Sequence, residues 1–146
     1  MDLYTYYRST SSYRVRIALA LKGLDYQALP VNLIAPPGGE HRQAAYLAIN
    51  PQGRVPALRT DEGAVLTDNA AITAYVEARW PDPPLLGRTA VEKAEIASWN
   101  WRVEFEGYTA IAEAFRNSTP AMVKLMRPPS RRGSSATKKK CPVVTQ

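Results

Sequence analysis

Hydrophobic and polar residues alternate at strand and helix spacing through residues 1–80. The pattern predicts, in chain order, a strand at 3–6, a helix from residue 11 or 12 to about 22, a strand at 26–33, a helix at 40–49, strands at 55–59 and 64–66, and a helix at 68–79. Gly23 is a natural stop for the first helix. The order βαβαββα predicts an α/β domain.

A proline-rich linker at 81–89 separates this domain from a long predicted helix at about 90–117. The apolar residues of that helix include Trp99, Trp101, Val103, Phe105, Ile111 and Phe115. A single helix cannot bury so large a stripe, so residues 90–121 are expected to be part of a helical domain. Without later helices to cover it, the stripe should make the chain aggregate or associate.

The positive charge is concentrated at the C-terminal end. The chain has 19 Lys and Arg against 13 Asp and Glu, and residues 122–146 hold seven of the basic residues and none of the acidic ones. The rest is near neutral, so we expect no basic groove for nucleic acid. Residues 122–146 have no apolar period and predict a disordered, protease-sensitive tail. That interpretation is favoured over nucleic-acid or membrane binding, because no aromatic residues interleave the charges.

The remaining composition argues against several classes of protein. No apolar run approaches the roughly 18–20 residues of a membrane span, and the N-terminal residues lack a signal-peptide pattern. The one cysteine, Cys141, permits no internal disulfide, which fits a reducing cytoplasm. His41 is the one histidine and has no histidine or cysteine partner for a metal, so we expect no metal site.

The segment Asn50-Pro-Gln-Gly-Arg-Val-Pro-Ala-Leu predicts a turn that leads into a short strand. Pro56 gives up a ladder hydrogen bond, so it must lie at a strand start, an edge or a bulge. We predict a cis Val55-Pro56 bond, because X-Pro bonds tolerate the cis form. Val55 would then turn its N–H and C=O away from the sheet, where an extended peptide can pair with them.

The segment Leu66-Thr-Asp-Asn-Ala-Ala-Ile places Asp68 and Asn69 at a helix start. Exposed N–H groups and the positive end of the helix dipole favour an anion there. Helix capping is the alternative role, since Asp and Asn both cap well, and one residue can do both. A peptide-binding strand edge beside a carboxylate-binding helix start describes a site for glutathione.

Over about residues 2–120 the chain resembles the cytosolic glutathione S-transferases. The segment Tyr7-Arg-Ser-Thr-Ser-Ser-Tyr-Arg-Val-Arg-Ile-Ala-Leu resembles the serine-rich signature of the zeta class, which includes maleylacetoacetate isomerase. The segment Thr67-Asp-Asn-Ala-Ala-Ile is more similar to bacterial beta-type transferases. The resemblance implies a thioredoxin-like domain at 1–80, a linker at 81–89 and a truncated all-α domain at 90–121, in a cytoplasmic homodimer.

The resemblance also implies how the thiol of glutathione is activated. A free thiol has a pKa near ~8.5, so an enzyme must stabilise the anion with a hydroxyl donor and a helix N-terminus. Ser9 matches the serine whose hydroxyl contacts the thiolate, and Thr10 lies in the same loop. Ser11 takes the place of a cysteine usual in the zeta class. The alternative is that all four residues of the loop 9–12 serve only the loop and the helix cap.

Further residues follow from the same resemblance. Asp68 would bind the γ-glutamyl ammonium and Asn69 the γ-glutamyl carboxylate, although the zeta class usually has Gln-Ser there. Val55 and Pro56 would hold the cysteinyl part, and Gln52 could also reach the tripeptide.

Three side chains have competing roles. His41 lies in the helix that approaches the glycine end of glutathione, although a surface role is favoured over a ligand contact. Arg14 and Arg16 are two residues apart and do not share a helix face. At most one of them can hold an acidic substrate, and Arg14 is favoured.

The sequence therefore predicts a protein that binds glutathione as co-substrate and activates its thiol. The reaction is conjugation to a small-molecule electrophile or cis–trans isomerisation. The electrophile site of the family uses side chains of the helical domain, so we expect weak or absent turnover. The alternatives are a non-catalytic glutathione-binding scaffold and a non-functional remnant. Turnover of a generic electrophile separates the enzyme from the scaffold.

Overall fold

The computed structural model describes residues 1–118. The predicted basic tail at 122–146 and the last residues of the expected helical domain lie outside that range. The chain is divided into two compact units, of which the first is Met1–Ala97 and the second begins at Ser98.

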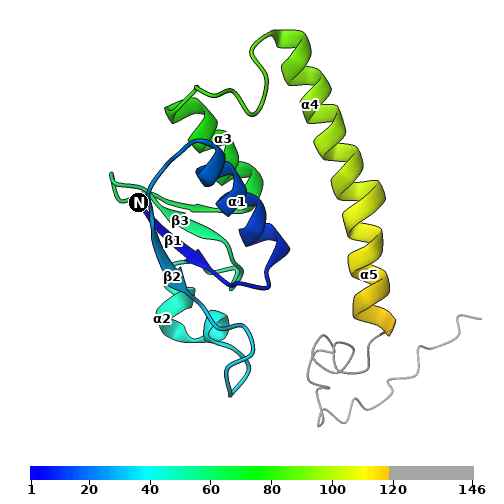
Figure 1. The fold of residues 1–146 in the computed structure, drawn as a ribbon. Helices are drawn as coiled ribbons and strands as arrows, with labels where there is room; N and C mark the ends of the chain where they lie inside the picture. The colour runs from blue at the N-terminus through cyan, green and yellow to red at the C-terminus, as the bar shows by residue number, and fades with distance from the viewer. Residues whose placement is uncertain (119–146) are drawn as a thin grey trace, which may run out of the picture. The chain divides into compact units, whose positions relative to one another are not determined.

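The first unit is built on a four-stranded mixed sheet (Figure 1). The strands are β1 (Asp2–Thr5), β2 (Gln27–Pro30), β3 (Ala57–Arg59) and β4 (Val65–Thr67). Their order across the sheet is β2-β1-β3-β4. β1 runs parallel to β2 and antiparallel to β3, and β3 runs antiparallel to β4.

Helices cover both faces of this sheet. On one face α1 (Thr10–Leu21) and α3 (Asn69–Arg79) pack against each other. On the other face lie a 3-10 turn, η1 (Glu40–Arg42), and a short helix, α2 (Ala44–Leu47). The element order confirms the predicted βαβαββα α/β fold.

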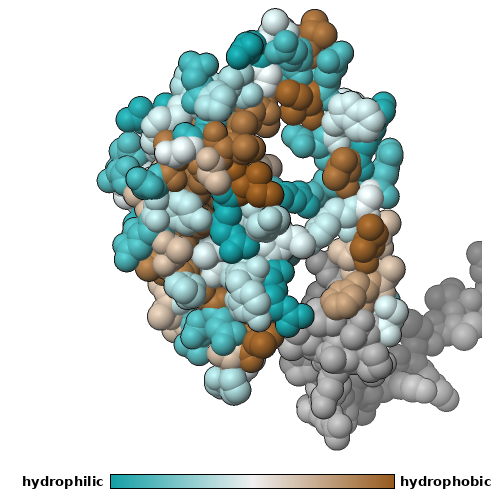
Figure 2. Space-filling model, in the orientation of Figure 1, coloured by the Kyte–Doolittle hydropathy of each residue, from teal (hydrophilic) through white to brown (hydrophobic). Residues whose placement is uncertain are grey.

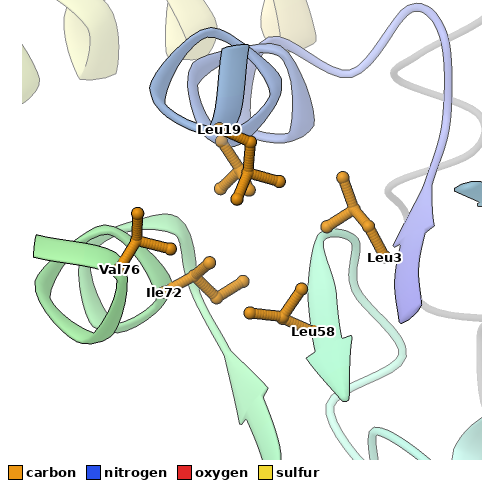
Figure 3. Close-up of a cluster of buried hydrophobic side chains, with 6 residues drawn as sticks. Leu3, Leu19, Leu58, Ile72 and Val76 are labelled. Atoms are coloured by element: carbon orange, nitrogen blue, oxygen red, sulfur yellow. The ribbon is translucent and has the colours of Figure 1, made fainter. Parts of the chain in front are cut away.

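Alternation along the strands divides the core in two. Leu3 and Leu58 are register partners and face α1 and α3, whereas their neighbours Tyr4 and Ala57 are paired one position along and face α2. The first cluster contains Leu3, Val15, Leu19, Leu58, Ile72 and Val76 (Figure 3). The second contains Tyr4, Tyr6, Val31, Tyr46, Val55 and Ala57.

Two predicted helix boundaries were wrong. The single helix expected at 40–49 is two short pieces, because Gln43 between them has extended backbone angles (φ −79°, ψ 150°). The first helix begins at Thr10, with Ser9 as its N-cap, rather than at Ser11 or Ser12. Both errors concern local backbone angles at polar residues, which hydrophobic spacing does not specify.

The long helix predicted at 90–117 contains an internal irregularity. It consists of α4 (Ala90–Arg102), a π-helical segment η2 (Val103–Tyr108) and α5 (Thr109–Ser118). The Thr109 hydroxyl donates to the Glu104 carbonyl at 2.7 Å within this region. Hydrophobic side chains appear at its surface among polar ones (Figure 2), and Trp99 and Trp101 are both 63% exposed. Within residues 1–118 no helix combines the length and apolar character needed to span a membrane.

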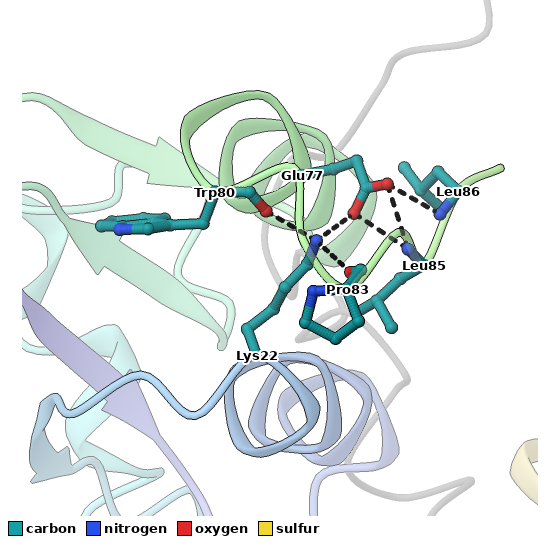
Figure 4. A network of polar contacts seen from close by, with 6 residues as sticks. All are labelled: Lys22, Glu77, Trp80, Pro83, Leu85 and Leu86. Carbon is teal, nitrogen blue, oxygen red and sulfur yellow. Dashed lines mark hydrogen bonds and ion pairs between the residues drawn. The ribbon is translucent and has the colours of Figure 1, made fainter. Parts of the chain in front are cut away.

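Within the first unit, an ion pair fastens the linker at 81–89 to the ends of α1 and α3 (Figure 4). The Lys22 side chain is 0% exposed, and its ammonium lies 2.6 Å from a Glu77 carboxylate oxygen. The same ammonium donates to the carbonyl oxygens of Trp80 and Pro83, each at 2.6 Å. The Glu77 carboxylate in turn accepts from the backbone N–H groups of Leu85 and Leu86 at 3.0–3.1 Å. The end of α1, the end of α3 and the linker are therefore held together by one network.

We expect Lys22→Met to reduce the free energy of unfolding by roughly 3 kcal/mol, because it leaves the largely buried Glu77 carboxylate, 15% exposed, without its counter-ion. Urea unfolding followed by circular dichroism measures this. Lys93→Met is the matched control, since Lys93 is exposed, and it should change stability by less than about 0.5 kcal/mol. Equal effects of the two substitutions would contradict a role for the network.

The network also predicts a pH dependence. Burial alone raises the pKa of Glu77, but hydrogen bonds from Lys22, Leu86 and Leu85, with the Lys22 charge, hold that pKa below its ordinary value of 4.5. A depressed carboxyl pKa stabilises the fold above pH 4.5, and this stabilisation is lost as pH falls through the folded-state pKa. The stability difference between wild type and Glu77→Gln should therefore shrink below pH 4.5. A constant difference down to acid pH would contradict the prediction.

Candidate functional site

The sheet register gathers three predicted segments at one end of the sheet. Ala57 pairs with Tyr4 on one side and with Thr67 on the other. Because both pairings are antiparallel, the C-terminal ends of β1 and β4 lie beside the N-terminal end of β3. The loop after β1 contains Ser9, the residues before β3 include Val55, and Asp68 follows β4 directly. These segments, far apart in sequence, emerge together.

Ser9 is the N-cap of α1, and this role leaves the proton of its hydroxyl available for donation to another group. Its backbone is extended (φ −76°, ψ 116°), and its Oγ accepts from the Ser12 N–H at 3.2 Å. The cap uses a lone pair of the oxygen and leaves the O–H proton for donation. Capping and thiolate binding, which the sequence left as alternatives for this loop, are therefore compatible at Ser9.

The other loop residues differ in accessibility. Thr10 is exposed and Ser11 is half-buried, both in the first turn of α1. Ser12 is completely buried, and its hydroxyl has no hydrogen-bond partner among residues 1–118. Ser12 therefore faces the interior, and Ser9 to Ser11 form the accessible part of the loop.

Val55 lies just outside the paired part of β3, which begins at Ala57. The Val55-Pro56 bond is cis, as predicted. The carbonyl oxygen of the preceding residue, Arg54, accepts from the Tyr46 hydroxyl at 2.6 Å and from the Asn50 side-chain amide at 2.8 Å. Sequence reasoning missed both donors.

Asp68 has the only positive φ of a non-glycine residue in the described range (φ 71°, ψ 136°). Such a conformation costs of the order of 1–3 kcal/mol and is characteristic of functional sites. The Asp68 side chain is exposed and makes no capping hydrogen bond to α3. The capping alternative therefore does not account for this carboxylate. Asn69, the first residue of α3, is half-buried.

Gly53, the neighbour of Gln52, allows the backbone at His41 to approach the turn that contains Gln52. A Cβ on Gly53 would lie 3.0 Å from the His41 carbonyl oxygen, so the chain near His41 packs against the turn at 50–54. The Gln52 N–H donates to the Asn50 side-chain oxygen at 3.0 Å, and the Gln52 side chain is exposed. Burial, assisted by the Arg42 charge, lowers the pKa of His41 and favours its neutral form.

Both predicted arginines of α1, Arg14 and Arg16, are half-buried. Arg16 donates to the Tyr7 carbonyl at 3.2 Å and lies over the Tyr13 ring, 5.2 Å from its centroid. Arg16 thus has contacts within the domain. Among residues 1–118 no group of three or more His, Cys, Asp or Glu is arranged to hold a metal ion.

Comparison with known proteins identifies a shared domain. Residues 8–79 match the family model described as glutathione S-transferase, N-terminal domain. The chain is 69% identical over 94 residues to a maleylacetoacetate isomerase of Pseudomonas aeruginosa, covering 64% of this chain and 44% of the isomerase. It is 47% identical over 94 residues to glutathione S-transferase Z1 of Arabidopsis thaliana, covering 64% and 41%. The chain thus aligns with less than half the length of these two relatives.

Solved structures give the same picture. A glutathione transferase homologue from Sulfitobacter with bound glutathione superposes with a TM-score of 0.71 at 30% identity, over 84% of this chain and 59% of that one. The holo structure of a maleyl pyruvate isomerase, a bacterial transferase of the zeta class, superposes with a TM-score of 0.68 at 35% identity, over 81% and 56%.

The strain at Asp68 predicts an unusual stability effect. Asp68→Gly should raise the free energy of unfolding by about 1 kcal/mol, because glycine adopts a positive φ without steric cost. Asp25→Gly is the control, since Asp25 is an exposed loop residue whose φ is not positive, and it should be neutral or destabilising. Chemical denaturation of both variants measures the difference. A loss of stability in Asp68→Gly as large as in the control would contradict strain at this position.

Proposed function

We propose, on the premise that residues 8–79 are the N-terminal domain of a glutathione S-transferase, that this chain binds reduced glutathione and activates its thiol. The observation that carries the proposal is the convergence of Ser9, Val55 and Asp68 at one end of the sheet. Each segment supplies a different kind of group: a hydroxyl donor, a strand-edge peptide and an exposed carboxylate.

The order of the strands fits the order of groups in the tripeptide. Asp68 and Asn69, after β4, would bind the γ-glutamyl ammonium and carboxylate. Val55, before the neighbouring β3, would pair with the cysteinyl backbone. Pro56 would support this contact. The glycine end would then extend toward Gln52 and His41.

The thiol would lie at the start of α1. The Ser9 O–H would donate to the sulfur while its oxygen continues to accept from Ser12. The positive end of the α1 dipole favours the same anion. Together these effects would lower the thiol pKa from its ordinary value near ~8.5 and supply thiolate at neutral pH. Ser11 would line the same turn in place of the zeta-class cysteine, and Thr10 would lie beside them.

Among the reactions of a thiolate, cis–trans isomerisation of an acidic alkene is favoured by the 69% identity to the Pseudomonas isomerase. The thiolate would add to one carbon of the double bond, the new single bond would rotate, and elimination would return the thiolate and the trans alkene. No atom or electron is gained or lost overall. Arg14 would hold a carboxylate of the substrate. Conjugation to a small electrophile uses the same thiolate.

The proposal includes the wider organisation implied by the family. It comprises a glutathione-binding domain at 1–80, a linker at 81–89, a helical region at 90–121 and a separate segment at 122–146, in a cytoplasmic homodimer.

Calorimetric titration of glutathione tests the site. Asp68→Ala should weaken binding by roughly 1.5–3 kcal/mol, the value expected for a charge-assisted hydrogen bond. Asp25→Ala, remote in sequence and exposed, is the control and should bind as wild type. A wild-type chain that does not bind glutathione would overturn the proposed function. An Asp68→Ala variant that binds normally would remove Asp68 from the site.

The thiolate absorbance of bound glutathione, titrated against pH, tests the role of Ser9. Ser9→Ala and Ser9→Asp should both raise the bound thiol pKa, because neither can donate a proton to the sulfur at neutral pH. Ser9→Asp keeps a good N-cap, whereas Ser9→Ala should also lose about 1 kcal/mol of stability. A bound thiol pKa unchanged in both variants would show that Ser9 is only a cap.

A further inference from the structure

The carbonyl group of Arg54 is held inside the protein by two side chains. The Tyr46 hydroxyl donates to it at 2.6 Å and the Asn50 amide at 2.8 Å. Tyr46 is 6% exposed and Asn50 is 1% exposed, so both donors act from the interior. A carbonyl oxygen has two lone pairs, and these two donors satisfy both.

This arrangement fixes the direction of the next N–H group. The Arg54–Val55 peptide is trans, and in a trans peptide the C=O and the following N–H point in opposite directions. With the Arg54 carbonyl directed to the interior, the Val55 N–H must point the other way. Within residues 1–118 this N–H makes no backbone hydrogen bond, since β3 pairing begins only at Ala57.

We propose that Tyr46 and Asn50 are positioning residues, which hold the Arg54–Val55 peptide so that the Val55 N–H donates to the cysteinyl carbonyl of glutathione. This inference rests on the proposed glutathione site and extends it to two residues that do not touch the ligand. They act through the orientation of a single peptide unit.

Asn50 also holds the turn that contains this peptide. Its side-chain oxygen accepts from the Gln52 N–H at 3.0 Å, and its backbone carbonyl accepts from the Gly53 N–H at 2.9 Å. Asn50 thus takes part in three hydrogen bonds of this turn. Without the two donors, the Arg54 carbonyl would be buried without a partner, which favours rotation of the peptide toward water. That rotation would turn the Val55 N–H inward.

The Tyr46 hydroxyl is a donor at every physiological pH. Burial, the largest effect, raises the pKa of Tyr46 to about 12, so its proton stays in place. The peptide orientation, and the ligand contact that depends on it, should therefore not titrate near neutral pH.

The test compares two ligands on two variants of the full chain, Tyr46→Phe alone and the double variant Tyr46→Phe/Asn50→Asp. Tyr46→Phe removes only the hydroxyl. Asn50→Asp replaces the amide donor with a carboxylate of the same shape. The ligands are glutathione and γ-glutamylcysteamine, which lacks the cysteinyl carbonyl and the glycine. Tyr75→Phe is the matched control, because its hydroxyl bonds the Glu62 carboxylate at 3.3 Å outside the site.

We expect the double variant Tyr46→Phe/Asn50→Asp to bind glutathione about ten-fold more weakly, the size expected for one lost hydrogen bond. Its affinity for γ-glutamylcysteamine should change by less than about two-fold, since that ligand lacks the cysteinyl carbonyl that would accept from the Val55 N–H. Tyr75→Phe should leave both affinities unchanged. This selective loss distinguishes positioning from general destabilisation, which would weaken both ligands alike.

A folded double variant that binds glutathione as wild type, or that loses both ligands equally, would overturn the inference. Tyr46→Phe alone keeps the Asn50 donor and serves if the double variant does not unfold cooperatively. It should show the same selectivity at about two- to three-fold, and equal loss of both ligands would again contradict positioning. Failure of the wild-type chain to bind glutathione would overturn the proposed function itself, whereas normal binding by the variants overturns only this inference.

Discussion

The pairing register of β3, which is antiparallel to both β1 and β4, organises the first unit. It places Leu58 beside Leu3 and Ala57 beside Tyr4, and so divides the core between the two faces of the sheet. The same register brings the start of β3 to the ends of β1 and β4. A slip of one residue would exchange the two faces and move Val55 away from its neighbours. Core and candidate site are therefore fixed by one set of hydrogen bonds.

Several residues of the proposed site also have structural roles, and their chemistry shows why the two roles are compatible. Ser9 caps α1 with its oxygen and keeps its proton. Asp68 ends β4 in a strained conformation without using its side chain to cap α3. Tyr46 and Asn50 fill the core and at the same time orient a peptide at the surface. In each of these residues, the atom that serves the structural role differs from the atom that serves the proposed site.

Features that depend on residues close together in the sequence were predicted correctly. The element order, the cis bond at Pro56 and the family resemblance were confirmed, because glycine, proline and apolar periodicity mark them directly. The single helix at 40–49 and the later start of α1 were wrong, because Gln43 and Ser9 adopt extended angles that no hydrophobic pattern specifies. The Lys22–Glu77 pair joins residues 55 positions apart, and the Tyr46–Arg54 bond depends on a folded turn. Such contacts carry no signal in one sequence.

Hydrogen exchange at the Val55 amide, measured by NMR with and without glutathione, reports whether this N–H is the group that binds the ligand. This N–H is directed away from the Tyr46 and Asn50 donors and lies outside the β3 ladder. We predict that glutathione slows its exchange and shifts its resonance, while the Leu58 amide, inside the ladder, is unchanged. Glutathione that binds and leaves the Val55 amide exchanging as before would contradict the account.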